Sequence, residues 1–222
     1  MSESHDHNDH SSNNNGLGCQ HHNVNFDGAS SAYKSRLWLV IAINAIMFIV
    51  EMTAGHQANS RSLQADALDF LGDSLTYGIS LAVIGSSLKV RSSAALFKGI
   101  SLFAMGIWVF VSTIWSIYFT QLPEAQTMGI IGFLALLANV ASVLILVAYK
   151  DGDANVRSVW LCSRNDAIGN VAVMIAAIGI WGTATAWPDL IVAIIMAGLF
   201  ISSAYQILRQ ALAENRRPKL TN

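Results

Sequence analysis

The sequence predicts an all-α membrane protein with six transmembrane helices and with both termini in the cytoplasm. Of its 222 residues, 53% are hydrophobic and 12% are charged, and this charged share is about half of what soluble domains carry. The apolar residues also form blocks of roughly 20, the length that a helix needs to cross a hydrocarbon core about 30 Å thick. Lysine and arginine are distributed unevenly between the connections, which sets the orientation.

Residues 1–36 are polar and of low complexity, and we expect them to form a disordered cytoplasmic tail. Five of the six histidines lie in this tail: His5, His7, His10, His21 and His22. A flexible tail with chance histidines is the simpler interpretation, but their clustering favours metal delivery or buffering. No apolar run follows a positive charge here, so the tail does not have the pattern of a secretory signal.

The first predicted span covers residues 37–56 and contains two polar exceptions, Asn44 and Glu51. They lie seven residues apart and therefore share one face of the helix. The two side chains could bond to neighbouring helices, or Glu51 could relay protons.

The second predicted span is less obvious, because the uncharged stretch 74–88 holds 15 residues. That is about 22 Å of helix, which is too short to cross a membrane. The helix must therefore begin near Asp66. Asp69 and Asp73 are then placed inside the membrane.

The remaining spans follow from the apolar blocks and from one tight connection. The third covers roughly 98–119, and the fourth covers roughly 128–149 without any charge. Residues 182–188 are the only stretch that can connect the last two helices, since such connections take about 2–8 residues. The fifth span therefore covers about 159–181, which draws Cys162 and Asp166 into the bilayer, and the sixth runs over 190–208. Residues 37–210 form the transmembrane domain, and 211–222 form a short basic tail.

Orientation follows from the basic residues, because cytoplasmic loops carry the excess of lysine and arginine. With six spans both termini share one side, and all basic residues but one fall on it: Lys34, Arg36, Lys89, Arg91, Lys98, Lys150, Arg157, Arg164, Arg209, Arg216, Arg217 and Lys219. Arg61 falls on the other side. We therefore expect a multi-pass protein of the cell (inner) membrane with cytoplasmic ends.

Three aspartates in the second span indicate a cation site. Asp66, Asp69 and Asp73 are spaced by three and four residues, which puts them on one helical face. An ionised carboxylate in lipid costs several kcal/mol and is rarely present without a function. Three neighbouring carboxylates repel one another unless they are protonated or bridged by a cation. A site that takes either protons or a metal ion suits a proton-coupled cation carrier.

The fifth span repeats this arrangement. Cys162 and Asp166 lie one turn apart on one face, and Asn170 follows one turn later. If the two helices pair, Asp69, Asp73, Cys162 and Asp166 converge. Four oxygen and sulfur ligands suit tetrahedral zinc, and a thiolate favours softer ions over magnesium or calcium.

The same residues have simpler interpretations. Asp66 could instead cap the helix or pair with Arg164, which could also neutralise Asp166. Taken alone, Cys162 is more often a small buried apolar residue than a ligand.

A stripe of small residues predicts which helices approach closely. Ser74, Gly78 and Ala82 repeat every four residues along the second span. Such stripes allow helix backbones to come together in membranes. We therefore expect the second and fifth helices to pack along it.

The chain resembles the cation diffusion facilitator family throughout its membrane part. Asn44 and Glu51 in "NAIMFIVEMTAG" match the first span of that family, and "SLQADALDFLGDSL" is similar to its second-span signature. "CSRNDAIGNVAV" resembles the fifth-span signature, and "WPDLIVAIIMAGLFISSAYQIL" resembles the sixth span. The resemblance implies that Asp69, Asp73 and Asp166 are metal ligands, and it assigns this role to Cys162 by position.

The resemblance implies export of zinc, cobalt or cadmium in exchange for protons, by a homodimer and without a prosthetic group. Cys162 stands where the family usually has histidine, which favours cadmium or cobalt over zinc. Only a short tail follows the sixth span. We therefore expect a short form without the family's cytoplasmic C-terminal domain, in which the histidine tail could substitute for metal sensing.

Other functions make different demands on the sequence. A carrier for another cationic substrate would need aromatic residues near the carboxylates, and Phe70 and Tyr77 are the close ones. A membrane metallohydrolase would need histidine-rich spans, so we do not expect an enzyme. A non-transporting metal sensor would depend on the histidine tail. The net charge of −1 gives no reason to expect a nucleic-acid partner.

Overall fold

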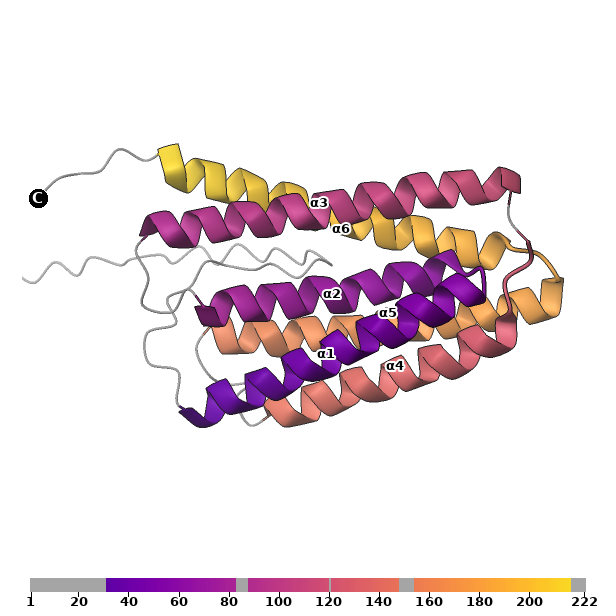
Figure 1. Cartoon of the computed structure of the whole chain (residues 1–222), viewed down its shortest axis with the longest axis horizontal. Helices are drawn as coiled ribbons and strands as arrows, with labels where there is room; N and C mark the ends of the chain where they lie inside the picture. The colour runs from indigo at the N-terminus through magenta and orange to yellow at the C-terminus, as the bar shows by residue number, and fades with distance from the viewer. Residues whose placement is uncertain (1–30, 83–87, 120, 148–153, 217–222) are drawn as a thin grey trace, which may run out of the picture.

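A computed structural model describes residues 31–82, 88–119, 121–147 and 154–216 (Figure 1). These residues form six helices: α1 (Ser31–Gln57), α2 (Arg61–Ala82), α3 (Leu88–Phe119), α4 (Ala125–Leu146), α5 (Ala154–Thr183) and α6 (Trp187–Arg216). No strand occurs in the described ranges, and the predicted all-α fold is confirmed. The tail histidines His5, His7, His10, His21 and His22 lie outside the described residues.

Five of the helices, all except α2, are long and apolar enough to cross a membrane. Large apolar side chains such as Ile107, Leu144 and Ile178 face outward, whereas the polar side chains of Asn44 and Thr113 are buried. This distribution is the reverse of that in a soluble protein and fits a helix bundle surrounded by lipid.

α2 differs from the other helices because its charged residues make it less apolar. Its 22 residues span about 33 Å, which is enough to cross the hydrocarbon core. It lies beside α1 in the bundle, and most of its side chains are buried (Figure 1). We therefore count α2 with the other five helices as a membrane span, which gives six spans among the described residues.

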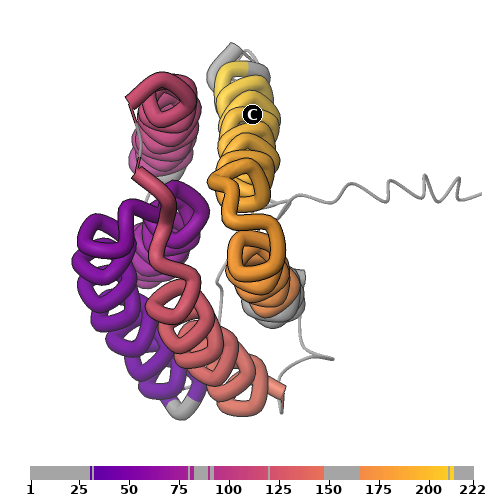
Figure 2. Tube along the Cα trace, turned by 90° about the vertical axis from the view of Figure 1, so that its right-hand side faces the viewer, coloured from indigo at the N-terminus to yellow at the C-terminus, as the bar shows by residue number. Residues whose placement is uncertain are grey.

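The helices pack as a group of four and a pair. α1, α2, α4 and α5 form the group, and α3 and α6 form the pair beside it (Figure 2). α2 and α5 join the two parts, because α2 contacts α3 and α6, and α5 contacts α6. Leu68 of α2 packs into an apolar cluster with Leu102 of α3 and Phe200 of α6.

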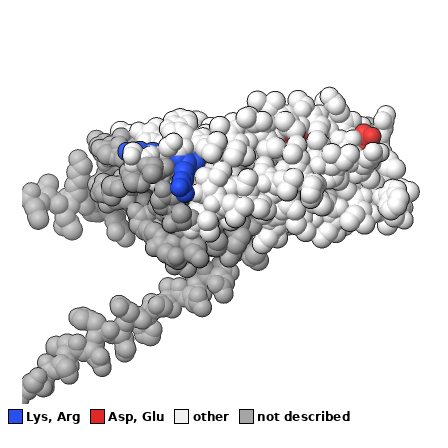
Figure 3. Space-filling view, turned by 90° about the horizontal axis from the view of Figure 1, so that it is seen from below, with Lys and Arg blue, Asp and Glu red and all other residues white. Residues whose placement is uncertain are grey.

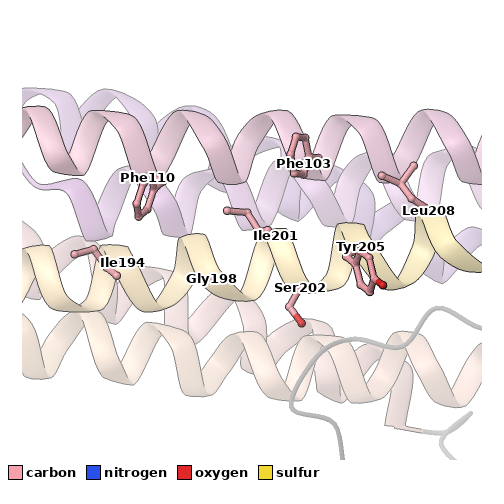
Figure 4. A pocket seen from close by; sticks show the side chains of 8 residues that line it. All are labelled: Phe103, Phe110, Ile194, Gly198, Ile201, Ser202, Tyr205 and Leu208. Atoms are coloured by element: carbon pink, nitrogen blue, oxygen red, sulfur yellow. The ribbon is translucent and has the colours of Figure 1, made fainter.

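α3 and α6 approach each other closely at Gly106. A Cβ atom there would lie 2.8 Å from Ile201 Cγ1, so a larger residue would push the helices apart. Phe103 of α3 and Gly198 and Tyr205 of α6 help to line a groove of about 550 Å³ on the outside of this pair (Figure 4). The groove lining is apolar except for the hydroxyl groups of Ser202 and Tyr205 and includes no acidic residue, so it offers no carboxylate to a cation.

The two ends of the bundle differ. The turns from α1 to α2, from α3 to α4 and from α5 to α6 lie at one end, here named the turn end, while α1 begins and α6 ends at the other (Figure 1). Lysine and arginine side chains gather toward the end with the termini in the view of Figure 3. In the predicted orientation, which follows from these same charges, the turn end faces away from the cytoplasm.

α2 begins at Arg61 instead of near Asp66 because two groups cap it. Ser60 Oγ accepts a hydrogen bond from the Leu63 N–H at 3.1 Å. The carboxylate of Asp189 in α6 accepts hydrogen bonds from the first backbone N–H groups of the helix. Asp66 thus lies in the second turn and does not cap the helix.

α1 and α6 are longer than their predicted spans. α1 begins at Ser31, within the predicted tail, and α6 continues to Arg216, within the predicted basic tail.

Candidate functional site

The acidic face of α2 points into the bundle. Asp66 and Asp73 are 1% and 8% exposed, and Asp69 between them is half-buried. Their spacing of three and four residues places them on one face, as the helical repeat requires. α2 therefore directs three carboxyl groups toward the interior.

Asp69 and Asp73 of α2 meet Asp166 of α5. The carboxyl group of Asp166 lies within hydrogen-bonding reach of both α2 carboxyl groups. We name these three residues the aspartate cluster. Because α2 and α5 run in opposite directions, the four-residue spacing in α2 lets one α5 residue reach both aspartates.

Two further residues act on Asp73. The fully buried Tyr77 donates a hydrogen bond from its hydroxyl to Asp73 Oδ2 at 2.5 Å. Lys98 of α3 lies close enough for its charge to act on the same carboxyl group. The sequence analysis did not predict either contact. The position of Tyr77 four residues after Asp73, on the same helical face, is a signal that could have indicated it.

Cys162 lies in α5 one turn before Asp166, but its side chain and that of Arg164 are outside the described part of the structure. Within the described residues, no three histidine, cysteine, aspartate or glutamate side chains are arranged to hold a metal ion. The set of Asp69, Asp73, Cys162 and Asp166 as metal ligands stays a prediction.

Glu51 of α1 and Asp66 of α2 form a second acidic feature, which we name the carboxyl pair. The two carboxyl groups lie within hydrogen-bonding reach of each other. Glu51 is fully buried, and neither of its oxygens has a partner with a donor group among the described residues. Asp66 Oδ2 likewise has no such partner. Buried acceptors without donors are rare in proteins.

Asn44 and Asn170 are the buried amides of the interior. Asn44 Oδ1 and both amide atoms of Asn170 have no hydrogen-bond partner among the described residues. A Cβ atom on Gly169 would lie 3.8 Å from Asp66 Oδ1, so this part of α5 sits at the level of Asp66. Asn170 follows Gly169 directly and therefore lies at the same level of the bundle as Asp66.

The predicted contact of α2 and α5 along the small-residue stripe is wrong. Ser74 Oγ lies 3.5 Å from the carbonyl oxygen of Ile41, so it faces α1. Among the described residues, a Cβ atom on Gly78 would meet nothing within 4 Å. The two helices meet instead through the acidic side chains and Gly169.

A different buried carboxylate lies at the turn end. Asp189 accepts hydrogen bonds from Ser60 Oγ at 2.7 Å, Ser62 Oγ at 2.6 Å and the N–H groups of Arg61 (2.8 Å) and Ser62 (3.0 Å). Arg61 in turn donates to Ser116 of α3 at 2.5 Å. We name these five residues the end network; it joins α2, α3 and α6, and sequence analysis did not predict it.

Comparisons with known proteins agree with this architecture. Residues 37–214 match the family model of the cation efflux transmembrane domain. The chain is 27% identical over 192 residues to the zinc transporter ZitB of Yersinia pestis. The match covers 81% of this chain and 62% of that protein, so the chain spans less than two thirds of its relative.

Proposed function

Since this chain belongs to the cation efflux family, we propose that it exports divalent transition-metal ions across the membrane in exchange for protons. The observation that carries the proposal is the aspartate cluster. Asp69, Asp73 and Asp166 come from two helices and lie within reach of one another inside a bundle that fits the bilayer. Three carboxyl groups so close together need protons or a metal ion to balance their charge.

The exchange then follows from competition for the same oxygens. When the cluster is open to the cytoplasm, its carboxyl groups release protons and take up a metal ion, which is the substrate. A rocking motion of the bundle exposes the ion to the other side, where protons replace it and reset the carrier. Asn44, Glu51, Asp66 and Asn170 are accessory residues beside this site. No prosthetic group is needed, since the carrier makes and breaks no covalent bond.

Zinc, cobalt and cadmium are the proposed substrates. Carboxylate oxygens with the Cys162 sulfur form a donor set that suits these ions better than magnesium or calcium. The relative from Yersinia pestis is a zinc transporter, which makes zinc the first ion to test. We propose that the chain works as a homodimer in the cell membrane, and that the tail histidines deliver or buffer the metal.

The test measures metal uptake into inside-out vesicles under a proton gradient, for zinc, cobalt and cadmium in turn. We expect uptake by the wild type and its loss in Asp73→Ala. The matched control is Glu124→Gln, which removes a carboxylate that is exposed to solvent and makes no capping hydrogen bond. Uptake by Asp73→Ala at the wild-type rate would reject the assignment of the site.

A further inference from the structure

Competition at the aspartate cluster does not explain the carboxyl pair. Glu51 and Asp66 are 0% and 1% exposed and come from different helices. Their carboxyl groups are within hydrogen-bonding reach, yet three of their four oxygens lack any donor among the described residues. Two ionised carboxylates in this arrangement would repel each other in a medium of low polarity, so the pair must hold a cation.

The surroundings of the pair also indicate a ligand. Asn170 is fully buried, and neither its amide oxygen nor its amide nitrogen has a hydrogen-bond partner among the described residues. It lies next to Gly169, which faces Asp66. Polar atoms without partners therefore gather at this level of the bundle, as they do where a ligand completes the hydrogen bonds.

No basic side chain in the described part of the chain acts on the pair. The charges that act on Glu51 and Asp66 are those of each other and of Asp69. α4 carries no charged residue, and the described acidic group of α5 is Asp166, which reaches the aspartate cluster. Lys98 of α3 acts on Asp73. On α6, Asp189 is occupied by the end network.

The number of carboxyl groups favours a proton over a metal ion. Two carboxyl groups within hydrogen-bonding reach share one proton in a single hydrogen bond, as acidic pairs in other proteins do. A divalent transition metal needs about four ligands, whereas the pair supplies two carboxyl groups, and the third acidic group that acts on it, Asp69, belongs to the aspartate cluster.

We propose that Glu51 and Asp66 together bind the exchanged proton, at a site separate from the metal-binding aspartate cluster. This inference rests on the proposed function, because it divides the exchange between two neighbouring sites. With the proton the pair carries one negative charge, and without it two. The positive charge of the proton lowers the metal affinity of the aspartate cluster. Proton binding and metal binding are therefore coupled electrostatically.

The position of the pair fits this role. Asp66 lies three residues before Asp69 and seven before Asp73, which is about 5–10 Å along the helix toward the turn end. In the predicted orientation, the turn end faces away from the cytoplasm. A proton that enters from outside therefore reaches the pair before it reaches the metal ion.

The experiment compares two modes of transport in proteoliposomes with zinc and cadmium as probes. Uptake driven by a pH gradient requires proton movement, whereas exchange of labelled for unlabelled metal does not. For Glu51→Gln, we expect gradient-driven uptake and metal-linked proton flux to fall at least about tenfold, since coupling energies of a few kcal/mol correspond to such factors. Metal exchange should stay within about twofold of the wild type. Glu124→Gln is the matched control and should change neither mode.

Each other result overturns the inference. Unchanged gradient-driven uptake and proton flux would show that the pair carries no exchanged proton. Loss of metal binding in calorimetry on the purified chain would place Glu51 among the metal ligands. Loss of both transport modes with intact metal binding would assign Glu51 to the conformational change. A wild type that transports neither metal would refute the proposed function itself.

A second variant covers the case in which Glu51→Gln does not fold. Asp66→Asn removes the other member of the pair and should give the same separation of the two modes. Infrared spectroscopy of the purified, metal-free chain gives a direct readout, because the shared proton adds a protonated-carboxyl absorption to that of the aspartate cluster, and either variant should reduce the total. An undiminished absorption in the variant that folds would contradict the assignment.

Discussion

Two buried carboxylates in this bundle differ in the donors that surround them. Asp189, at the turn end, is fully buried and accepts four hydrogen bonds. Glu51, in the interior, is equally buried, and neither of its oxygens accepts a hydrogen bond from the described residues. Burial alone therefore does not distinguish a structural carboxylate from a functional one, whereas the supply of donors does.

The difference has a physical basis in the energy of charge in a medium of low polarity. A carboxylate with enough donors is stable as an anion and fixes the elements that provide them. One without donors keeps its affinity for a proton or a metal ion, because either would replace the missing interactions. The end network therefore holds helices together, whereas the proposed exchange of cations uses the interior acidic residues.

The largest expected effect is the loss of stability in Asp189→Ala. The substitution leaves Ser60, Ser62 and the first N–H groups of α2 without their acceptor. Breaking such a buried set costs about 3 kcal/mol or more. Thermal unfolding of the purified chain in detergent should shift to a clearly lower temperature.

Asp189→Asn is the matched variant for this test, because the amide keeps one acceptor oxygen for the same donors. It should lose less stability than Asp189→Ala. If both variants unfold at the wild-type temperature, the end network does not hold α2 and α6 together. The structural role that distinguishes Asp189 from Glu51 would then be wrong.

Asp69→Asn should change stability in the opposite direction. It removes one of several like charges that act on one another in the interior. Substitutions that relieve strain at functional sites stabilise proteins by about 0.5–2 kcal/mol while they impair activity. In metal-free detergent solution, the variant should unfold at a higher temperature than the wild type and should bind zinc more weakly. Lower stability would mean that Asp69 has a structural role like that of Asp189.

The contrast between the end network and the interior acidic residues also shows which features could be predicted from the sequence. Hydropathy predicted the six helices, because lipid imposes length and composition on each span, whereas the orientation read from the charges stays a prediction. Helical spacing was enough to put Asp69 and Asp73 on one face, and the structure brings Asp166 to them.

Sequence could not predict contacts that depend on a distant partner. α2 begins earlier than its hydropathy indicates because Asp189 of another helix satisfies its first N–H groups. The small-residue stripe predicted the wrong neighbour at Ser74, which faces α1, since small residues allow a close approach without specifying the helix that makes it. Both errors arise from tertiary packing, which local patterns do not contain.

Tyr77→Phe tests whether a single donor tunes the aspartate cluster. The hydroxyl of Tyr77 holds Asp73 Oδ2 and so orients the other oxygen of that carboxylate. One such hydrogen bond is worth about 1 kcal/mol, so metal affinity should fall about fivefold. Calorimetric titration with zinc measures this change. An unchanged affinity would show that Asp73 needs no donor to bind metal, or that it does not bind metal.

The smallest expected effect is that of deleting residues 1–30, which include all five tail histidines. If the acidic residues of α2 and α5 carry the exchange, metal flux into proteoliposomes at saturating zinc should stay within about twofold of the full chain, because a polar tail adds little to the bundle interior. Delivery of metal by the histidines would be detected in the metal flux at limiting zinc. A non-transporting sensor that depends on the tail would instead lose its metal response completely. Complete loss of flux at saturating zinc would therefore show that transport depends on the tail and not on the buried carboxylates alone.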